Sequence, residues 1–162
     1  MNTLLIEQTK SLLEEKDLLA ALCNVTALLY QETEDINWLG FYFFKDNELV
    51  LGPFQGRVAC THLKLNKGVC AHAFNLKELV IVDDVHTFAS HIACDSRTNS
   101  ELVAPMICGN EIIGVLDIDS ISFNRFSKED GETFMTIANT IANRIKNTTL
   151  LICTQFPGHI DL

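Results

Sequence analysis

Two apolar runs joined by a glycine–asparagine pair constrain the fold of this 162-residue chain more than any other feature. The runs span residues 101–108 and 111–119, and Gly109-Asn110 stands between them. Two-residue turns rich in Gly and Asn match the twist of paired antiparallel strands. We therefore expect a β-hairpin over residues 101–119.

The other elements surround this hairpin in an order that indicates the fold class. Leucines recur near helical spacing over residues 4–30 without Gly or Pro, which predicts one long helix. Four further apolar runs are typical of strands. They span residues 36–44, 48–52, 57–65 and 79–82, and a short helix is expected over 69–76. Ser127-Lys128-Glu129-Asp130 has the form of a capping box and predicts the start of a C-terminal helix. The order favours an α+β fold, an antiparallel sheet with the terminal helices packed on one face and a ligand pocket on the other.

Composition narrows the classes of function. Apolar residues make up 48% and the formal net charge is −9, which suits a single globular domain over residues 1–150 followed by a C-terminal tail, 151–162. The acidic balance disfavours nucleic acids and anionic membrane surfaces as partners, because both require a basic face. The first residues lack the pattern of a signal peptide, and no apolar run is long enough to span a membrane. We therefore expect a cytoplasmic protein.

Six cysteines are spread through the chain without a C-x-x-C pair, which argues against a structural zinc site. We expect them to be largely reduced, and we expect neither a metal nor an organic cofactor. Cys94 is the most interesting of them, because it lies in a polar segment over residues 83–100, between His91 and Asp95. It is either an inert thiol, a reactive thiolate, or one half of a cysteine-hydrolase pair with His91 or His86.

Two aspartates at strand spacing are the second chemical feature. Asp117 and Asp119 share one face of the second hairpin strand with Ile113 and Val115, which predicts partial burial at a pocket floor. The alternative is a strand end whose acids face water. If both are buried, at least one is expected to hold its proton near neutral pH, because like charges repel and burial disfavours ionisation.

Glu101 and Trp38 are further candidates. An ideal two-residue turn would pair Asp117 with Leu102 and would place Glu101 on the opposite face of the sheet. Only a bulge or an irregular strand end, for which Pro105 is a plausible cause, would bring Glu101 to the aspartates. Trp38, the only tryptophan, is either a core residue or the wall of a ligand site.

Eight segments, taken together, resemble the free methionine-(R)-sulfoxide reductases, a family of GAF-fold enzymes. The segments are NWLGFYFF, LGPFQG, AC, KGVC, HIACDS, SELVAP, GVLDIDS and RFSKED, and they cover roughly residues 20–145. GVLDIDS followed by RF-x-x-x-D is common to many GAF domains and therefore supports the fold. The three cysteines, together with NWLGFY and HIACDS, are more specific and support the activity.

The resemblance implies roles for individual residues. Cys94 matches the attacking cysteine, Cys60 the main resolving cysteine, and Cys70 an alternative or auxiliary one. Trp38 matches the pocket wall beside the substrate methyl group. The acids Glu101, Asp117 and Asp119 match the groups that bind the ammonium and the sulfoxide oxygen, with Glu101 or Asp119 as the proton donor. A thioredoxin-like dithiol is the implied reductant, and free methionine sulfoxide the implied substrate.

Two departures from the family pattern stand out. Ala71 follows Cys70 where the family usually has Gly, which would cause strain if that position required a positive φ. Phe88-Ala89-Ser90-His91 stands where the family usually has FPGH, so the loop that carries Cys94 lacks the expected Pro and Gly.

Two alternative functions stay open at this point. A GAF fold also suits a non-enzymatic module that senses a small ligand, because fold does not fix function. The second alternative is a redox switch in which Cys60 and Cys94 pair to alter a partner. The oligomeric state is open as well, since the apolar stripes on the terminal helices are compatible with a homodimer.

Overall fold

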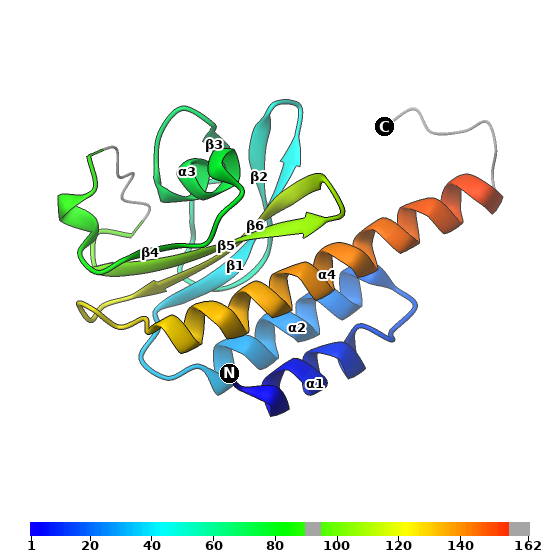
Figure 1. The fold of residues 1–162 in the computed structure, drawn as a ribbon, viewed down its shortest axis with the longest axis horizontal. Helices are drawn as coiled ribbons and strands as arrows, with labels where there is room; N and C mark the ends of the chain where they lie inside the picture. Colours follow the sequence, from blue (N-terminus) through cyan, green and yellow to red (C-terminus); the bar gives the residue numbers. More distant parts are fainter. Residues whose placement is uncertain (90–94, 156–162) are drawn as a thin grey trace.

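A six-stranded antiparallel sheet with helices on both faces forms the body of the molecule (Figure 1). The computed structural model describes residues 1–89 and 95–155, and the strand order is β3-β2-β1-β6-β5-β4. Helices α1, α2 and α4 lie on one face, and α3 covers the other (Figure 1). The strands are β1 (Trp38–Lys45), β2 (Glu48–Gly56), β3 (His62–Lys64), β4 (Val80–Val82), β5 (Ser100–Cys108) and β6 (Glu111–Ser120). The helices are α1 (Thr3–Leu12), α2 (Leu18–Glu32), α3 (Val69–Leu76), α4 (Lys128–Gln155) and the short 3-10 turn η1 (Val85–Thr87). The predicted α+β layout, with terminal helices on one face, is confirmed.

The single N-terminal helix expected from the leucine pattern is wrong. The chain forms two helices, α1 and α2, that lie side by side (Figure 1). The side chain of Asp17 accepts a hydrogen bond from the backbone N–H of Ala20 at 2.8 Å, so it caps a new helix where the pattern suggested continuation. The break lets Leu5 of α1 and Val25 of α2 bury in the same core beneath the sheet.

The strands differ from expectation mainly around residues 52–62. Strand β2 continues to Gly56, and the strand expected over 57–65 is only β3, three residues long. Residues 57–61 form neither helix nor strand, so Cys60 lies in a connecting segment. Helix α3 begins and ends where the sequence predicts. The capping box of α4 is confirmed, since Ser127 and Asp130 each accept a hydrogen bond from the other's backbone N–H, at 3.1 and 2.8 Å.

A bulge in the central hairpin decides which side chains face the pocket. The turn pairs Cys108 with Glu111 and Ile107 with Ile112, as an ideal two-residue turn requires. The register then shifts by one residue, so that Met106 pairs with Gly114 and Glu101 pairs with Asp119. The bulge expected near Pro105 is therefore confirmed. All odd-numbered residues of β5 up to Pro105 now share a face with the aspartates of β6.

The same shift corrects the expected place of Ile113. Ile113 packs against the helix-side core, together with Leu116 and Ile118, and not beside Val115 on the pocket face. Gly114 makes the shift feasible, since its φ is +156° and a Cβ atom there would lie 2.1 Å from the carbonyl oxygen of Tyr42. A side chain at this position would therefore clash with the backbone of β1.

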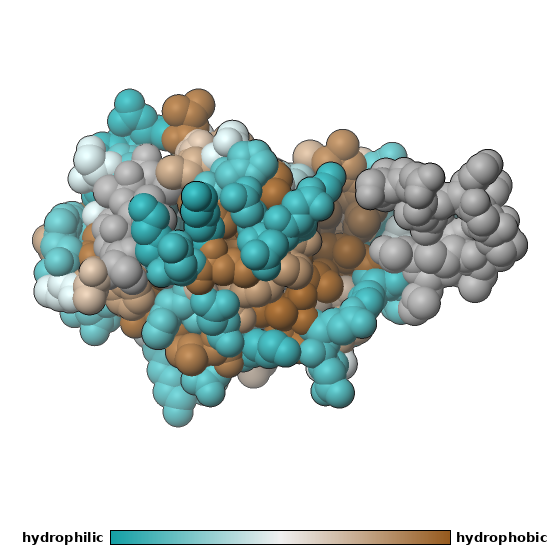
Figure 2. All heavy atoms as spheres, turned by 90° about the horizontal axis from the view of Figure 1, so that it is seen from above, coloured by the Kyte–Doolittle hydropathy of each residue, from teal (hydrophilic) through white to brown (hydrophobic). Residues whose placement is uncertain are grey.

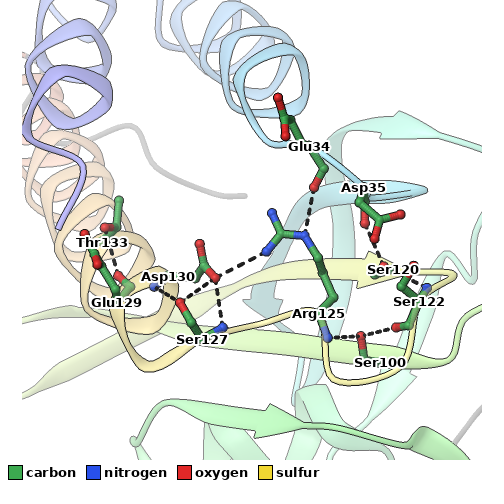
Figure 3. A network of polar contacts seen from close by, with 10 residues as sticks. All are labelled: Glu34, Asp35, Ser100, Ser120, Ser122, Arg125, Ser127, Glu129, Asp130 and Thr133. Carbon is green, nitrogen blue, oxygen red and sulfur yellow. Dashed lines mark hydrogen bonds and ion pairs between the residues drawn. The ribbon is translucent and has the colours of Figure 1, made fainter.

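A polar network ties the open ends of the central strands to the start of α4 (Figure 3). The hydroxyl of Ser100 donates to the carbonyl of Ser122 at 2.7 Å, and that of Ser120 donates to the carbonyl of Asp35 at 2.6 Å. Arg125 donates to the carbonyl of Glu34 at 2.9 Å. Ser100 and Ser120 are paired neighbours and directly precede and follow the paired acids Glu101 and Asp119. The network therefore fixes the strand ends that carry two of the candidate site residues.

The outer surface carries both polar and apolar side chains. Seen from above, the layer that covers the pocket face shows mainly hydrophilic side chains with apolar ones between them (Figure 2). In the part of the chain that the structure describes, no helix is both long and apolar enough to cross a membrane.

Candidate active site

Three neighbouring strands place the candidate residues in adjacent rows. Trp38 of β1 pairs with Asp119 of β6, which pairs in turn with Glu101 of β5. The next row holds Asp117, flanked by Gly40 and Val103. Directly opposed residues in antiparallel strands have Cβ atoms about 5 Å apart. The sheet therefore concentrates three carboxyl groups within a few ångströms beside one indole ring.

A pocket lies over these rows, between the sheet, α3 and two further segments, one with Val58 and Ala59 and the other with Asp95 and Thr98. Its empty volume, with the mouth included, is about 570 Å³. The lining combines apolar side chains with the acids named above. The lining residues are Trp38, Tyr42, Val58, Ala59, Leu63, Lys67, Gly68, Val69, Cys70, Asp95, Thr98, Glu101, Asp117 and Asp119.

Trp38 is a fixed wall of this pocket. It is buried, and its indole N–H donates to the carbonyl of Arg57 at 3.0 Å. The ring also stacks on Phe54 and Tyr42, with ring centroids 5.5 and 5.9 Å apart. These contacts leave the ring little freedom, and Trp38 is both a member of the buried core and a wall of the pocket.

The carboxyl groups are held in conditions that favour their neutral forms. Burial raises the pKa of Asp117 to about 6, although hydrogen bonds from Cys70 and Glu101 oppose the rise. Burial also raises the pKa of Glu101 well above its ordinary value, and the charges of Asp117 and Asp119 add to the effect. The pKa of Asp119, which keeps partial contact with solvent, is raised by burial and by the charges of Asp117 and Asp95. This agrees with the expectation that at least one acid is protonated near neutral pH.

Cys70 lies at the pocket floor under these acids. Its Sγ is 4.0 Å from Oε1 of Glu101, and the side chain is buried. Burial raises the pKa of this thiol well above its ordinary value, and the charges of Asp117 and Glu101 raise it further. The ligand atoms of Cys70, Glu101 and Asp117 all lie within 4.8 Å of one another, which is the spacing of a possible metal site. Ala71 lies in α3 and is not among the residues with positive φ, so the backbone strain considered for a residue other than Gly at this position does not arise.

Cys60 has a different environment. It is partly exposed, and it lies in the segment 57–61, two of whose residues line the pocket. Its carbonyl oxygen accepts a hydrogen bond from the hydroxyl of Tyr42 at 2.9 Å, which anchors the segment to the sheet. Cys60 therefore borders the pocket without being enclosed by it.

The predicted attacking residue, Cys94, and its neighbour His91 lie outside the described residues. After Cys94, Arg97 forms an ion pair with Asp95 at 2.7 Å. Asn37, next to Trp38, donates to Asp95 at 3.4 Å and to Thr98 at 3.3 Å. His86, the other suggested hydrolase partner, is exposed and contacts Asp84 at 2.8 Å, and it does not line the pocket described above.

Several pocket residues were not anticipated from the sequence. Tyr42, Lys67 and Thr98 line the pocket, and Thr98 donates to Asp119 and opposes the rise in its pKa. Asn37 and Asp95 belong to the segments NWLGFY and HIACDS, so their position in those segments was a usable signal. Thr98 offers no such signal, because its role depends on a contact between two distant segments.

Comparison with known proteins identifies the family. The GAF domain model matches residues 17–145. The free methionine-R-sulfoxide reductase of Escherichia coli is 52% identical over 116 residues, which cover 72% of this chain and 70% of that protein. The structure of the substrate complex of free methionine-R-sulfoxide reductase from Neisseria meningitidis is 35% identical and superposes with a TM-score of 0.85, covering 91% of this chain and 89% of that one. The reduced form of the Staphylococcus aureus enzyme fRMsr is 45% identical with a TM-score of 0.83, covering 88% and 94%. The chain therefore belongs to the GAF domain family and, within it, to the free methionine-R-sulfoxide reductases.

Proposed function

We propose that this chain reduces free L-methionine (R)-sulfoxide to L-methionine, with Cys94 as the nucleophile. The observation that carries the proposal is the row of Trp38, Asp119 and Glu101, which the bulge completes by bringing Glu101 to the face that also holds Asp117. An apolar wall beside several carboxyl groups suits a small molecule that has a methyl group at one end and an ammonium at the other. The similarity to the substrate-bound Neisseria meningitidis enzyme adds support.

The acids supply what the first chemical step needs. The sulfoxide oxygen is a poor leaving group until it receives a proton. Glu101 and Asp119 have raised pKa values because of burial, so either can hold a proton and donate it to that oxygen. The thiolate of Cys94 then attacks the sulfoxide sulfur. The S–O bond of the substrate breaks, the protonated oxygen passes to Sγ of Cys94, and methionine departs, so that Cys94 is left as a sulfenic acid.

The second step restores the oxidation state of the protein. The thiol of Cys60 attacks the sulfenic acid, which forms a Cys60–Cys94 disulfide and releases water. Cys60 is better suited to this role than Cys70, because it is partly exposed and Cys70 is buried with a pKa raised by burial and by the acids. A thioredoxin-like dithiol then reduces the disulfide by exchange, and neither a metal nor an organic cofactor takes part.

The pocket also gives a reason for the preference for a free amino acid. An acidic pocket attracts the ammonium of a free amino acid, and a methionine within a peptide has no such charge. Asp117, with a pKa raised only to about 6, is the acid that is ionised most readily and is the natural partner of the ammonium. The same acids disfavour a phosphate ligand, which weakens the case for a cyclic-nucleotide sensor.

Steady-state kinetics with the separate epimers of free methionine sulfoxide, dithiothreitol and purified variants test the proposal. Cys94→Ser is expected to lose turnover completely. Asp119→Asn is expected to lower kcat, while Asp117→Asn is expected to raise KM with a smaller effect on kcat. Cys23→Ser, an exposed cysteine of α2, is the matched control and is expected to behave as the parent protein. Substantial turnover by Cys94→Ser, or unchanged kinetics in both aspartate variants, would contradict the mechanism.

A further inference from the structure

Cys70, Glu101 and Asp117 form a compact set of mixed ligands at the pocket floor. Their sulfur and oxygen ligand atoms all lie within 4.8 Å of one another, and all three side chains are buried. Zinc and similar ions are bound in proteins by thiolate, imidazole and carboxylate ligands. We propose that these three residues form a binding site for a divalent cation of the zinc type.

The geometry requires only a small adjustment. In a tetrahedral site with a metal–sulfur bond of about 2.3 Å and metal–oxygen bonds of about 2.0 Å, sulfur and oxygen ligands lie about 3.5 Å apart. The present separation between Sγ of Cys70 and Oε1 of Glu101 is 4.0 Å. Side-chain rotation within the pocket is enough to close that difference.

A second observation points to a ligand at the same place. Oδ1 of Asp117 is buried and, among the described residues, has no hydrogen-bond partner, so the interactions of this carboxyl group with Cys70 and Glu101 leave one of its oxygens unsatisfied. Asp117 is only 7% exposed, so water reaches the group poorly. A buried acceptor without a partner is unfavourable by roughly 1 to 3 kcal/mol. A cation between Asp117, Glu101 and Cys70 would satisfy this oxygen.

The chemistry of the ligands selects the kind of ion. Sulfur favours zinc, cobalt and similar ions over magnesium and calcium, which prefer oxygen ligands alone. Binding releases the thiol proton and any carboxyl protons to the solvent, and it involves no change of oxidation state. Three anionic ligands then outweigh the double positive charge by one unit, and the nearby Asp119 and Asp95 add to the attraction for a cation.

Such a site differs from the structural zinc centre that the cysteine spacing argues against. It provides only three protein ligands, and its fourth position faces the pocket. The cation would occupy Asp117 and Glu101, which the proposed function assigns to the ammonium and the sulfoxide oxygen of the substrate, so zinc is expected to compete with substrate. It would also shield Cys70 from alkylation. The competition rests on the proposed function, whereas the binding does not.

The binding is tested on the reduced full chain with Co²⁺ and Zn²⁺, independently of turnover. Isothermal titration with Zn²⁺ is expected to give one equivalent per chain. Co²⁺ is expected to give a near-ultraviolet thiolate-to-metal absorption band. Cys70→Ser is expected to remove that band and to weaken Zn²⁺ binding at least tenfold. Cys23→Ser, whose thiol is exposed on α2, is expected to retain both properties.

Two further variants keep the test decisive. Glu101→Gln and Asp117→Asn keep the shape of the side chains and are each expected to weaken Zn²⁺ binding at least tenfold, with folding checked by thermal unfolding. Unchanged affinity in all three site variants, or a band that survives in Cys70→Ser, would overturn the proposal. If the chain binds Zn²⁺ through Cys70 but reduces no methionine sulfoxide, the metal site stands and the proposed function fails. Turnover that Zn²⁺ does not inhibit would overturn the competition.

Discussion

Replacing Asp117 by Asn is expected to stabilise the fold at neutral pH while it impairs the site. The pKa of Asp117 rises from 3.8 to about 6 on folding, with burial as the main cause. At 1.36 kcal/mol per pH unit, ionising this buried group lowers the free energy of unfolding by about 3 kcal/mol. Asn has nearly the same shape and carries no charge, so the variant avoids this penalty.

The pH dependence gives the prediction its sign. Since the folded pKa is raised, the stability contributed by the neutral carboxyl is complete below pH 3.8 and is lost as the pH rises to about 6. The variant should therefore match the parent protein near pH 4 and exceed it above pH 6. For a chain of this size, 2 to 3 kcal/mol corresponds to a rise in Tm of roughly 5 to 10 °C.

Thermal unfolding followed by circular dichroism between pH 4 and pH 8 is the assay. Asp46→Asn is the matched control, because Asp46 lies in the turn between β1 and β2 with a positive φ of 50°, which Asn tolerates well. A Tm difference between Asp117→Asn and the parent protein that does not change with pH would refute the reasoning. So would a lower Tm in the variant at pH 8.

Three further predictions follow from particular contacts. Substrate affinity is expected to increase as the pH rises through about 6, because ionised Asp117 binds the ammonium. Titration of Cys94→Ser with free methionine sulfoxide at several pH values would measure this affinity, and a pH-independent affinity would contradict the prediction. Ser127→Ala removes the reciprocal cap of α4 and is expected to lower the free energy of unfolding by about 1 kcal/mol in urea titrations, whereas Ser96→Ala, at an exposed loop position, should have no effect. Gly114→Ala places a Cβ atom against the carbonyl of Tyr42. This variant is expected to lower the free energy of unfolding by at least about 2 kcal/mol and to reduce activity, because it disturbs the bulge. A stable, fully active variant would contradict the role of the bulge.

Local chemistry predicted the parts of the fold that depend on neighbouring residues. The Gly109-Asn110 turn and the reciprocal cap of Ser127 and Asp130 are set by short-range hydrogen bonds, and the structure has both. The break before α2 was missed because the leucine spacing continues through it, and only the cap at Asp17 reveals it. Periodicity alone does not separate one long helix from two that pack side by side.

The site was harder to predict than the fold, because it depends on register. An ideal turn placed Glu101 on the wrong face, and only the bulge opposite Met106 brings it to Asp119. Pro105 made an irregularity in this strand plausible, but only the resemblance to a family required the bulge. Gly114 inside the second apolar run is typical of a bulge or a close backbone approach, but its contact with Tyr42 joins strands far apart in the sequence, so the sequence did not show which strand comes close.

A single-turnover experiment tests the central claim most directly. The fully reduced chain is mixed with each epimer of free methionine sulfoxide without an external reductant, and methionine and disulfides are then quantified by mass spectrometry. The account predicts about one methionine per chain from the R epimer alone, together with a disulfide between Cys60 and Cys94. Methionine formation without oxidation of Cys94, or no methionine from either epimer, would contradict it.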